Sequence, residues 1–191
     1  NDILTSRHNY CPASADLHSL VLSCSSNGGF TVHCALCYNF IASWKLSNSK
    51  IIQMRVVPNK KLLAAIDTTH LYIYKESNNM LAKACSFEFE EEEYASCFTF
   101  ASDNVIVVGM VSGKGTIIDF NENEDGTFSL SQRLIIRMHS HQISTILSCA
   151  DLKKIDECKD IYDTFNLDGI VCSIGVDDTL KVTDCFTGVL Q

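Results

Sequence analysis

The chain has 191 residues, of which 46% are hydrophobic and 20% charged, which is the balance of a folded domain rather than a disordered one. Its formal net charge of -8 argues against nucleic-acid binding, because a protein that binds the phosphate backbone needs a clustered basic face. The longest apolar run, residues 105–111, is far shorter than the roughly 20 residues of a membrane-spanning helix, so we expect no membrane insertion.

Short apolar segments alternate with turn-forming residues along most of the chain, and each segment predicts a β-strand. In chain order, strands are predicted at 20–23, 30–36, 40–46, 51–57, 62–66, 71–74, 85–89, 97–100, 105–110, 116–120, 134–138, 143–149, 170–174 and 180–182. The intervening segments are rich in Gly, Asn and Asp, which favour turns because Gly and Asn tolerate positive φ and Asx side chains bond the nearby backbone. Dense strands without helices between them predict an antiparallel all-β fold, either a sandwich, a barrel or a propeller.

One segment departs from this pattern. Between Asp151 and Asp168, apolar residues recur at three- and four-residue spacing, which is the period of an amphipathic helix. These residues are Ile155, Cys158, Ile161, Tyr162 and Phe165. We predict a helical insertion near 151–168, with an irregular loop as the alternative.

Three stretches share one layout, in which an apolar strand, a polar turn and a strand of alternating residues follow one another. They are 62–79, 105–123 and 169–188, and a fourth copy fits upstream with its second strand near Cys34. Once the segment 151–168 is subtracted, the copies recur about every 40 to 45 residues, which is the period of four-stranded propeller blades. After an N-terminal extension at 1–18, we therefore predict a β-propeller segment at 19–191. Its predicted blades are 19–49, 50–92, 93–142 and 143–191.

The last copy resembles the WD-repeat family. The positions that match the family's Gly-x-Asp-x-Thr-(Ile/Leu)-(Lys/Arg)-Val-Trp-Asp-x-x-Thr-Gly are Gly175, Asp177, Thr179, Leu180, Lys181, Val182, Asp184, Thr187 and Gly188. Thr183 stands where the family has Trp. Upstream, His139 precedes Ile143 by four residues, as in the family's Gly-His element, with Met138 in place of the Gly.

The resemblance implies a structural hydrogen-bond network of His139, Ser173 and Asp177. In such a network a carboxylate in a tight turn orients an imidazole, and the shared bonds hold a loop against a strand. Without a Trp N–H at Thr183, the network is expected to end at Ser173. The same three residues also form the nearest thing to a Ser-His-Asp catalytic arrangement. A nucleophile elbow needs Gly-x-Ser-x-Gly between a strand and a helix, which Ser173 lacks, so a Cys- or Ser-dependent hydrolase is the remote alternative.

Other residues that carry chemistry give no cofactor site. Ten cysteines are spread along the chain, and many lie in apolar strands, which is typical of small buried hydrophobes in a reducing, cytoplasmic compartment. Cys34 and Cys37 form a Cys-x-x-Cys without the second pair that a structural zinc site needs. The segment 109–116 lacks the spacing of a phosphate loop. The acidic run 88–94 predicts a solvated loop between blades, with a patch for a basic partner as the alternative. We expect that the protein is not an enzyme and that it binds no cofactor and no metal.

A narrower resemblance covers 56–79 and 94–100. These stretches are similar to the small WD-repeat subunit of TOR kinase complexes, the G-protein-beta-like subunit. The matching positions are Pro58, Lys60, Ala64, Ala65, His70, Leu71, Ile73, Tyr74, Ser77, Asn78, Asn79, Ala95 and Ser96, whereas Thr69, Tyr72 and Lys75 depart from the pattern.

This resemblance implies a non-catalytic scaffold for protein–protein interaction that docks on the kinase domain of a TOR-type kinase and stabilises its active-site cleft. A WD-repeat subunit of a coat, chromatin or ubiquitin-ligase complex is the alternative, since it shares the same fold-level features. Members of the family close a ring of about seven blades, within the usual four to eight, so we expect this sequence to be a fragment of such a ring. The alternatives are a ring completed by another chain and a divergent small ring.

Overall fold

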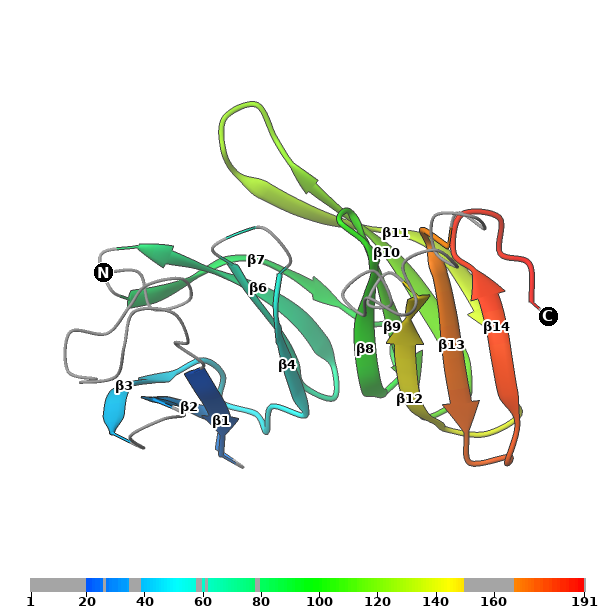
Figure 1. The fold of residues 1–191 in the computed structure, drawn as a ribbon, viewed down its shortest axis with the longest axis horizontal. Helices are drawn as coiled ribbons and strands as arrows, with labels where there is room; N and C mark the ends of the chain where they lie inside the picture. The colour runs from blue at the N-terminus through cyan, green and yellow to red at the C-terminus, as the bar shows by residue number, and fades with distance from the viewer. Residues whose placement is uncertain are drawn as a thin grey trace, which may run out of the picture. The chain divides into compact units, whose positions relative to one another are not determined.

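The computed structural model describes residues 20–25, 27–34, 39–57, 60, 62–77, 80–149 and 167–190. Within these ranges the chain forms fourteen β-strands in four antiparallel sheets and no α-helix, which confirms the predicted all-β class (Figure 1). The predicted N-terminal extension at 1–18 lies outside the described residues, and so does nearly all of the predicted helix near 151–168. No described segment forms a helix of the length and hydropathy needed to cross a membrane.

Each sheet is a meander, in which strands that follow one another in the sequence are neighbours in the sheet. The first sheet has the order β1 (Leu20–Cys24), β2 (Gly29–Cys34), β3 (Phe40–Lys45). The second has the order β4 (Gln53–Val56), β5 (Leu62–Ile66), β6 (His70–Ser77), β7 (Met80–Glu88). The third comprises β8 (Ala95–Ser102), β9 (Val105–Met110), β10 (Lys114–Glu122) and β11 (Phe128–Arg137), and the fourth β12 (Ile143–Ser148), β13 (Ile170–Gly175) and β14 (Leu180–Asp184). Each sheet lies within one of the segments 19–49, 50–92, 93–142 and 143–191.

The chain divides into two compact units. The first comprises Asn1–Thr68 with Tyr72–Ala84, and the second comprises Thr69–Leu71 with Cys85–Gln191. In the first unit the buried core is made of Phe30, Val32, Ile51, Leu63, Ala65 and Tyr74. Trp44 stacks on Phe30 with 5.6 Å between ring centroids, and the Tyr74 hydroxyl donates a hydrogen bond to the carbonyl oxygen of Leu46 at 2.7 Å.

In the second unit, the third and fourth sheets stack face to face and share one core. The buried members are Cys97, Ala101, Val105, Val107, Ile117, Met138, Ile143, Ile146, Val171 and Cys185. All six residues of β9 are buried, which is the pattern of a strand covered on both faces. A strand of this kind reads as a continuous apolar run in the sequence, and 105–110 was predicted on that basis.

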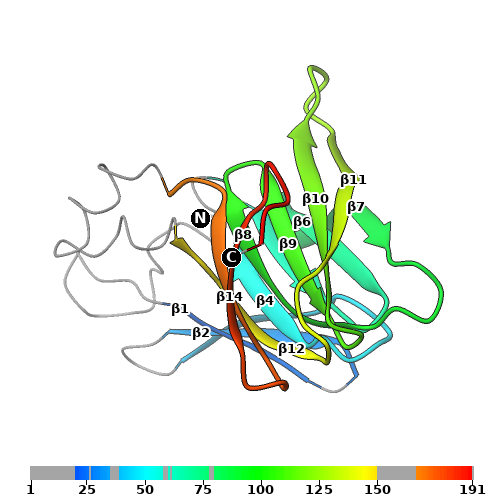
Figure 2. The same cartoon turned by 90° about the vertical axis from the view of Figure 1, so that its right-hand side faces the viewer.

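Several predicted strands are longer in the structure than in the sequence analysis. The prediction at 134–138 covers only the second half of β11, and the hairpin of β10 and β11 projects past the other strands of its sheet (Figures 1 and 2). The projecting half of β11 is mostly polar and half-buried or exposed, so it lacks the apolar run on which the prediction depended. Likewise, β7 begins five residues before the predicted 85–89.

The turn between β9 and β10 requires glycine at position 113. Gly113 has a φ of 88°, and a Cβ atom there would lie within 3.0 Å of the carbonyl oxygens of His139 and His141. Its own carbonyl oxygen accepts hydrogen bonds from the backbone N–H groups of Met138 and His139. This close approach places the β11–β12 loop on the β9–β10 turn.

We predict that Gly113→Ala destabilises the protein by clearly more than about 1 kcal/mol, the usual cost of an L side chain at positive φ alone. Gly126→Ala is the matched control, because Gly126 also has a positive φ of 77° but no atom within 4 Å of a Cβ at that position. Urea denaturation of both variants measures the difference. Equal losses of stability in the two variants would contradict this prediction, because they would show that the contact of the β11–β12 loop with Gly113 does not contribute to stability.

Candidate functional site

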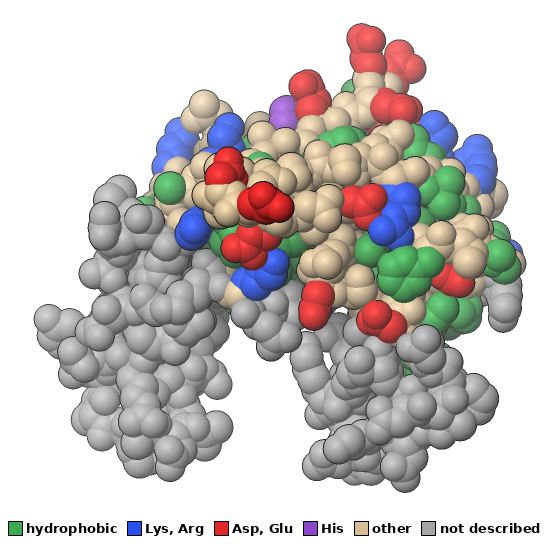
Figure 3. All heavy atoms as spheres, turned by 90° about the horizontal axis from the view of Figure 1, so that it is seen from above, with side chains coloured by type: hydrophobic (Ala, Val, Ile, Leu, Met, Phe, Trp, Pro, Cys, Tyr) green, Lys and Arg blue, Asp and Glu red, His purple; other side chains and the backbone are tan. Residues whose placement is uncertain are grey.

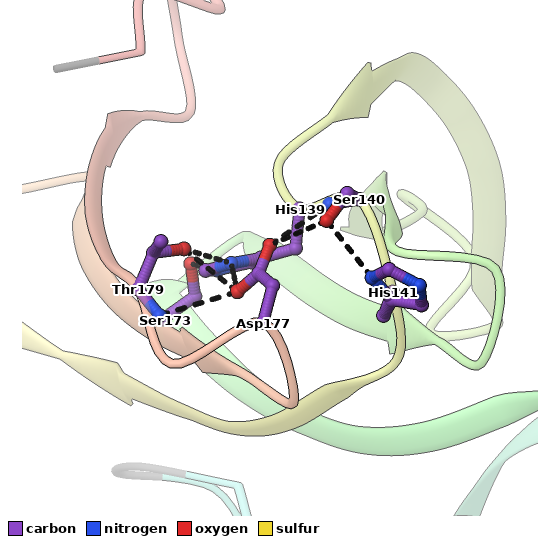
Figure 4. A network of polar contacts seen from close by, with 6 residues as sticks. All are labelled: His139, Ser140, His141, Ser173, Asp177 and Thr179. Carbon is purple, nitrogen blue, oxygen red and sulfur yellow. Dashed lines mark hydrogen bonds and ion pairs between the residues drawn. The ribbon is translucent and has the colours of Figure 1, made fainter.

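The predicted residues His139, Ser173 and Asp177 meet at one end of the fourth sheet (Figure 4). His139 lies in the loop between β11 and β12, Ser173 lies in β13, and Asp177 lies in the turn between β13 and β14. The distance from His139 Nδ1 to Asp177 Oδ1 is 3.0 Å, and the distance from His139 Nε2 to Ser173 Oγ is 2.9 Å. The structure therefore brings all three together through one imidazole.

Two further residues complete the network. The Thr179 hydroxyl donates to Asp177 Oδ1 at 2.7 Å and lies 2.9 Å from His139 Nδ1. Ser140 donates to Asp177 Oδ2 twice, from its backbone N–H at 2.9 Å and from its hydroxyl at 3.1 Å. Since Asp177 accepts every one of these bonds as a carboxylate, His139 fits best as the tautomer with its proton on Nδ1. Its Nε2 then accepts a hydrogen bond from the Ser173 hydroxyl.

The sequence around Asp177 shapes the turn that holds the carboxylate. A Cβ atom on Gly175 would lie 2.5 Å from both Asp177 Oδ1 and His139 Nδ1, so a side chain at this position would occupy the site of the network. Asp178 has a positive φ of 58°, a conformation that Asp and Asn adopt more readily than most residues. The backbone N–H of Thr179 donates to Asp177 Oδ1 at 3.3 Å, which closes an Asx turn.

The network holds Asp177 in its charged form. The hydrogen bond from the Thr179 hydroxyl contributes most to a pKa well below the usual range of a carboxyl, and the Ser140 backbone N–H and the His139 side chain lower that pKa further. Burial acts in the opposite direction but does not outweigh these bonds. The carboxylate is thus an acceptor across the whole physiological pH range.

The hydrogen bonds run in the same order as in a Ser-His-Asp triad. The serine and the histidine, however, are more deeply buried than in a triad. In a triad the serine oxygen faces the substrate. Here Ser173 is 0% exposed and His139 is 2% exposed, and Ser173 lies one residue from Ile174 and two from Val171, a member of the shared core. A substrate carbonyl has no approach to Ser173 Oγ in this arrangement. The geometry is suited to fixing the β11–β12 loop on the β13–β14 turn.

Thr183 is the residue that departs from the motif in the resemblance to WD repeats, which have Trp there. It is 0% exposed, it pairs with Val171 across β13 and β14, and its hydroxyl has no hydrogen-bond partner among the described residues. A buried hydroxyl without a hydrogen-bond partner lowers the free energy of unfolding. The Trp of the family would instead offer an N–H as a hydrogen-bond donor.

The remaining predicted positions fall elsewhere. Cys34 ends β2 and Cys37 lies outside the described residues, while the described part of the chain contains no group of three His, Cys, Asp or Glu side chains placed to hold a metal ion. The segment 109–116 forms the end of β9, a tight turn and the start of β10, with Gly109 paired to Gly115.

The acidic run 88–94 joins β7 to β8 and lines a shallow surface hollow. Glu93 forms a 2.5 Å ion pair with Lys114 and accepts a hydrogen bond from the Ser112 hydroxyl at 2.6 Å. Burial opposes its ionisation, but these two partners lower the pKa of Glu93 overall. On the face drawn in Figure 3, acidic and basic side chains of the described residues are interspersed rather than gathered by sign.

Comparison of the sequence with family models finds no match, and no curated protein matches it. The functional interpretation therefore depends on the motifs and on the geometry of the site.

We predict that the stability supplied by Asp177 decreases in acid. Because its pKa is lower in the folded chain than in the unfolded one, the stabilising contribution is complete above the ordinary Asp pKa of about 3.9 and is lost as the pH falls toward the folded value. Asp177→Asn should be less stable than the parent at neutral pH, and the gap should narrow below about pH 4 in urea titrations. Asp178→Asn, which changes the exposed neighbour, should show no such narrowing. Parallel pH profiles for Asp177→Asn and the parent would contradict the assigned role.

We predict that Thr183→Val stabilises the protein by about 1 kcal/mol, because it removes an unpaired hydroxyl and keeps the β-branched shape. Thr187→Val should do the opposite, since the Thr187 hydroxyl donates to Asp184 Oδ2 at 2.8 Å. Thermal unfolding of the two variants gives the comparison. A loss of stability in Thr183→Val would show that its hydroxyl has a partner in solution.

Proposed function

We propose that this chain is a segment of a WD-repeat β-propeller and acts as a non-catalytic scaffold for protein–protein interaction. The observation that carries the proposal is the hydrogen-bond network of His139, Ser173 and Asp177, which joins the loop after one four-stranded sheet to the hairpin of the next. These are the residues that the resemblance to WD repeats assigns to this role. In a propeller, a network of this kind fixes the connection between successive blades.

The sheets also support the proposal. Four meanders follow one another along the chain, and the third and fourth stack face to face within the second unit. Blades bury their faces in this way, because a single small sheet has too little core of its own.

The outer face of the fourth sheet fits the surface on which a further blade would stack. Leu147, Ile174 and Leu180 lie on this face and are 53%, 42% and 62% exposed. The register pairs Ile174 with Leu180 and Leu147 with Cys172, so the apolar side chains run across all three strands. An exposed apolar face of this extent is typical of a surface that is covered in the complete assembly. We propose that another antiparallel sheet of the same kind covers it.

The edge of the fourth sheet agrees with this reading. Leu190 makes an isolated antiparallel bridge to Thr183 of β14, and the backbone N–H of Asp184 donates to the carbonyl oxygen of Val189 at 3.0 Å. In the third sheet the same side of the third strand is occupied by β11. Residues 189 and 190 thus lie where the fourth strand of a blade would run.

For the partner, we propose a TOR-type kinase, on the resemblance at 56–79 and 94–100. Most of the matching residues in the described ranges are core positions, such as Ala64, Ala65, Leu71, Ile73 and Tyr74, which are all buried. Matches at core positions support a similar propeller core, but they carry no information on the surface that binds a partner. A coat, chromatin or ubiquitin-ligase complex is therefore the alternative assembly, and partner identification decides between them.

We predict that affinity purification of the full-length protein from its native cells recovers a TOR-type kinase at near-equal molar amount. Quantitative mass spectrometry measures the ratio, and the same purification with Gly175→Ala tests whether capture depends on the folded network. Stoichiometric recovery of another complex without the kinase would reject the TOR assignment and retain the scaffold. Recovery of no stoichiometric protein partner at all would reject the scaffold.

A further inference from the structure

Two free cysteines lie side by side in the fourth sheet. Cys172 is in the middle of β13, and Cys149 follows directly after β12. Their Sγ atoms are 4.0 Å apart, although the residues are separated by 23 positions in the sequence. The two strands pair antiparallel with Leu147 opposite Cys172, so Cys149 is the diagonal neighbour of Cys172 on the same face of the sheet.

We propose that Cys149 and Cys172 form a peroxide-sensitive dithiol that closes reversibly to a disulfide. In the first step one thiolate attacks the peroxide O–O bond, gives a sulfenic acid and releases water. In the second step the other thiol attacks that sulfur, an S–S bond forms and a second water leaves. Overall two thiols lose two electrons and two protons, the peroxide is reduced to two waters, and an added dithiol reverses the reaction. The pair lies on the face of the fourth sheet that carries Leu147 and Ile174. The inference therefore concerns the chain with that face open, and a sheet stacked there would shield both thiols from peroxide.

The positions of the two thiols favour this pair over Cys24, Cys97 and Cys185. Cys149 and Cys172 are both half-buried, so a small peroxide reaches them, whereas Cys97 and Cys185 are buried in the shared core. Burial also raises the pKa of the Cys185 thiol to about 12, which keeps it protonated and unreactive. Cys24 is exposed, but its thiol lies 3.5 Å from the carbonyl oxygen of Ile51 rather than beside a second thiol.

The two cysteines have different parts in the reaction. Burial, followed by the neighbouring Cys172, raises the pKa of Cys149 to about 11. Cys149 is therefore a poor first nucleophile at neutral pH, and the first attack on the peroxide falls to Cys172. Cys149 is the resolving thiol, which attacks the sulfenic sulfur in the second step. Its contact with that sulfur compensates for the small fraction of Cys149 that is present as thiolate. Closure should accordingly become faster as the pH rises toward 11.

The test is peptide mapping of the full chain after brief treatment with hydrogen peroxide, alkylation of the remaining thiols with N-ethylmaleimide, and trypsin digestion without reductant. Trypsin cleaves after Arg137, Lys153, Lys159 and Lys181, so Cys149, Cys158 and Cys172 fall on separate peptides. We expect peptides 138–153 and 160–181 to be joined, and dithiothreitol to separate them. Cys149→Ser and Cys172→Ser should each abolish this product, whereas Cys24→Ser should retain it.

A second measurement avoids dependence on the variants. Phenylarsine oxide bridges two adjacent thiols, so it should protect Cys149 and Cys172 of the parent from N-ethylmaleimide together and leave Cys24 reactive. Circular dichroism of the two Ser variants checks that they fold. The proposal is overturned if both cysteines remain alkylatable after peroxide, if they are found only as separate sulfinic acids, or if the main product joins Cys149 to another cysteine such as Cys158.

Discussion

A sheet of three or four short strands has two faces, and in the second unit of this chain both faces of the sheets are apolar. One sheet alone cannot bury both, so the third and fourth sheets stack and share a core of residues such as Val107, Ile117 and Ile146. On β9, Val105 and Val107 face this core and are buried in it. The positions of the loops at the sheet ends, and hence of every polar residue they carry, follow from this stacking.

The polar network depends on that arrangement and reinforces it. Met138 is packed in the shared core, whereas the next residue, His139, directs its imidazole toward Ser173 and Asp177. Gly113 and Gly175 leave the space that the loop and the imidazole occupy. Five side chains from a loop, a strand and a turn are thereby held in one geometry.

The sequence was sufficient for the fold class and for the main residues of the network. Each predicted strand overlaps an observed one, because apolar alternation and turn residues are local signals. His139, Ser173 and Asp177 were identified from the resemblance of the surrounding motif to WD repeats. Ser140 was missed, since its main contribution is a backbone N–H that any residue type would supply. Its position immediately after His139 was the one signal that the sequence offered.

The contact of Cys149 with Cys172 was beyond prediction for a different reason. It depends on the register of β12 against β13, and a shift of one residue would place the two thiols on opposite faces. The polar half of β11 was missed because its pairing with β10 compensates for the absence of an apolar run. Local patterns thus give the elements, while contacts between distant elements require the three-dimensional structure.

The meander order of the sheets has a consequence for folding kinetics. Strand pairing within each sheet joins neighbours in the sequence, which is a low-contact-order topology and favours rapid local formation. The bond between His139 and Asp177 spans 38 residues and needs two finished sheets, so we expect it to form late, after the rate-limiting step. Loss of the network would then leave the folding rate nearly unchanged and accelerate unfolding, so the network would act as a kinetic latch on the native state.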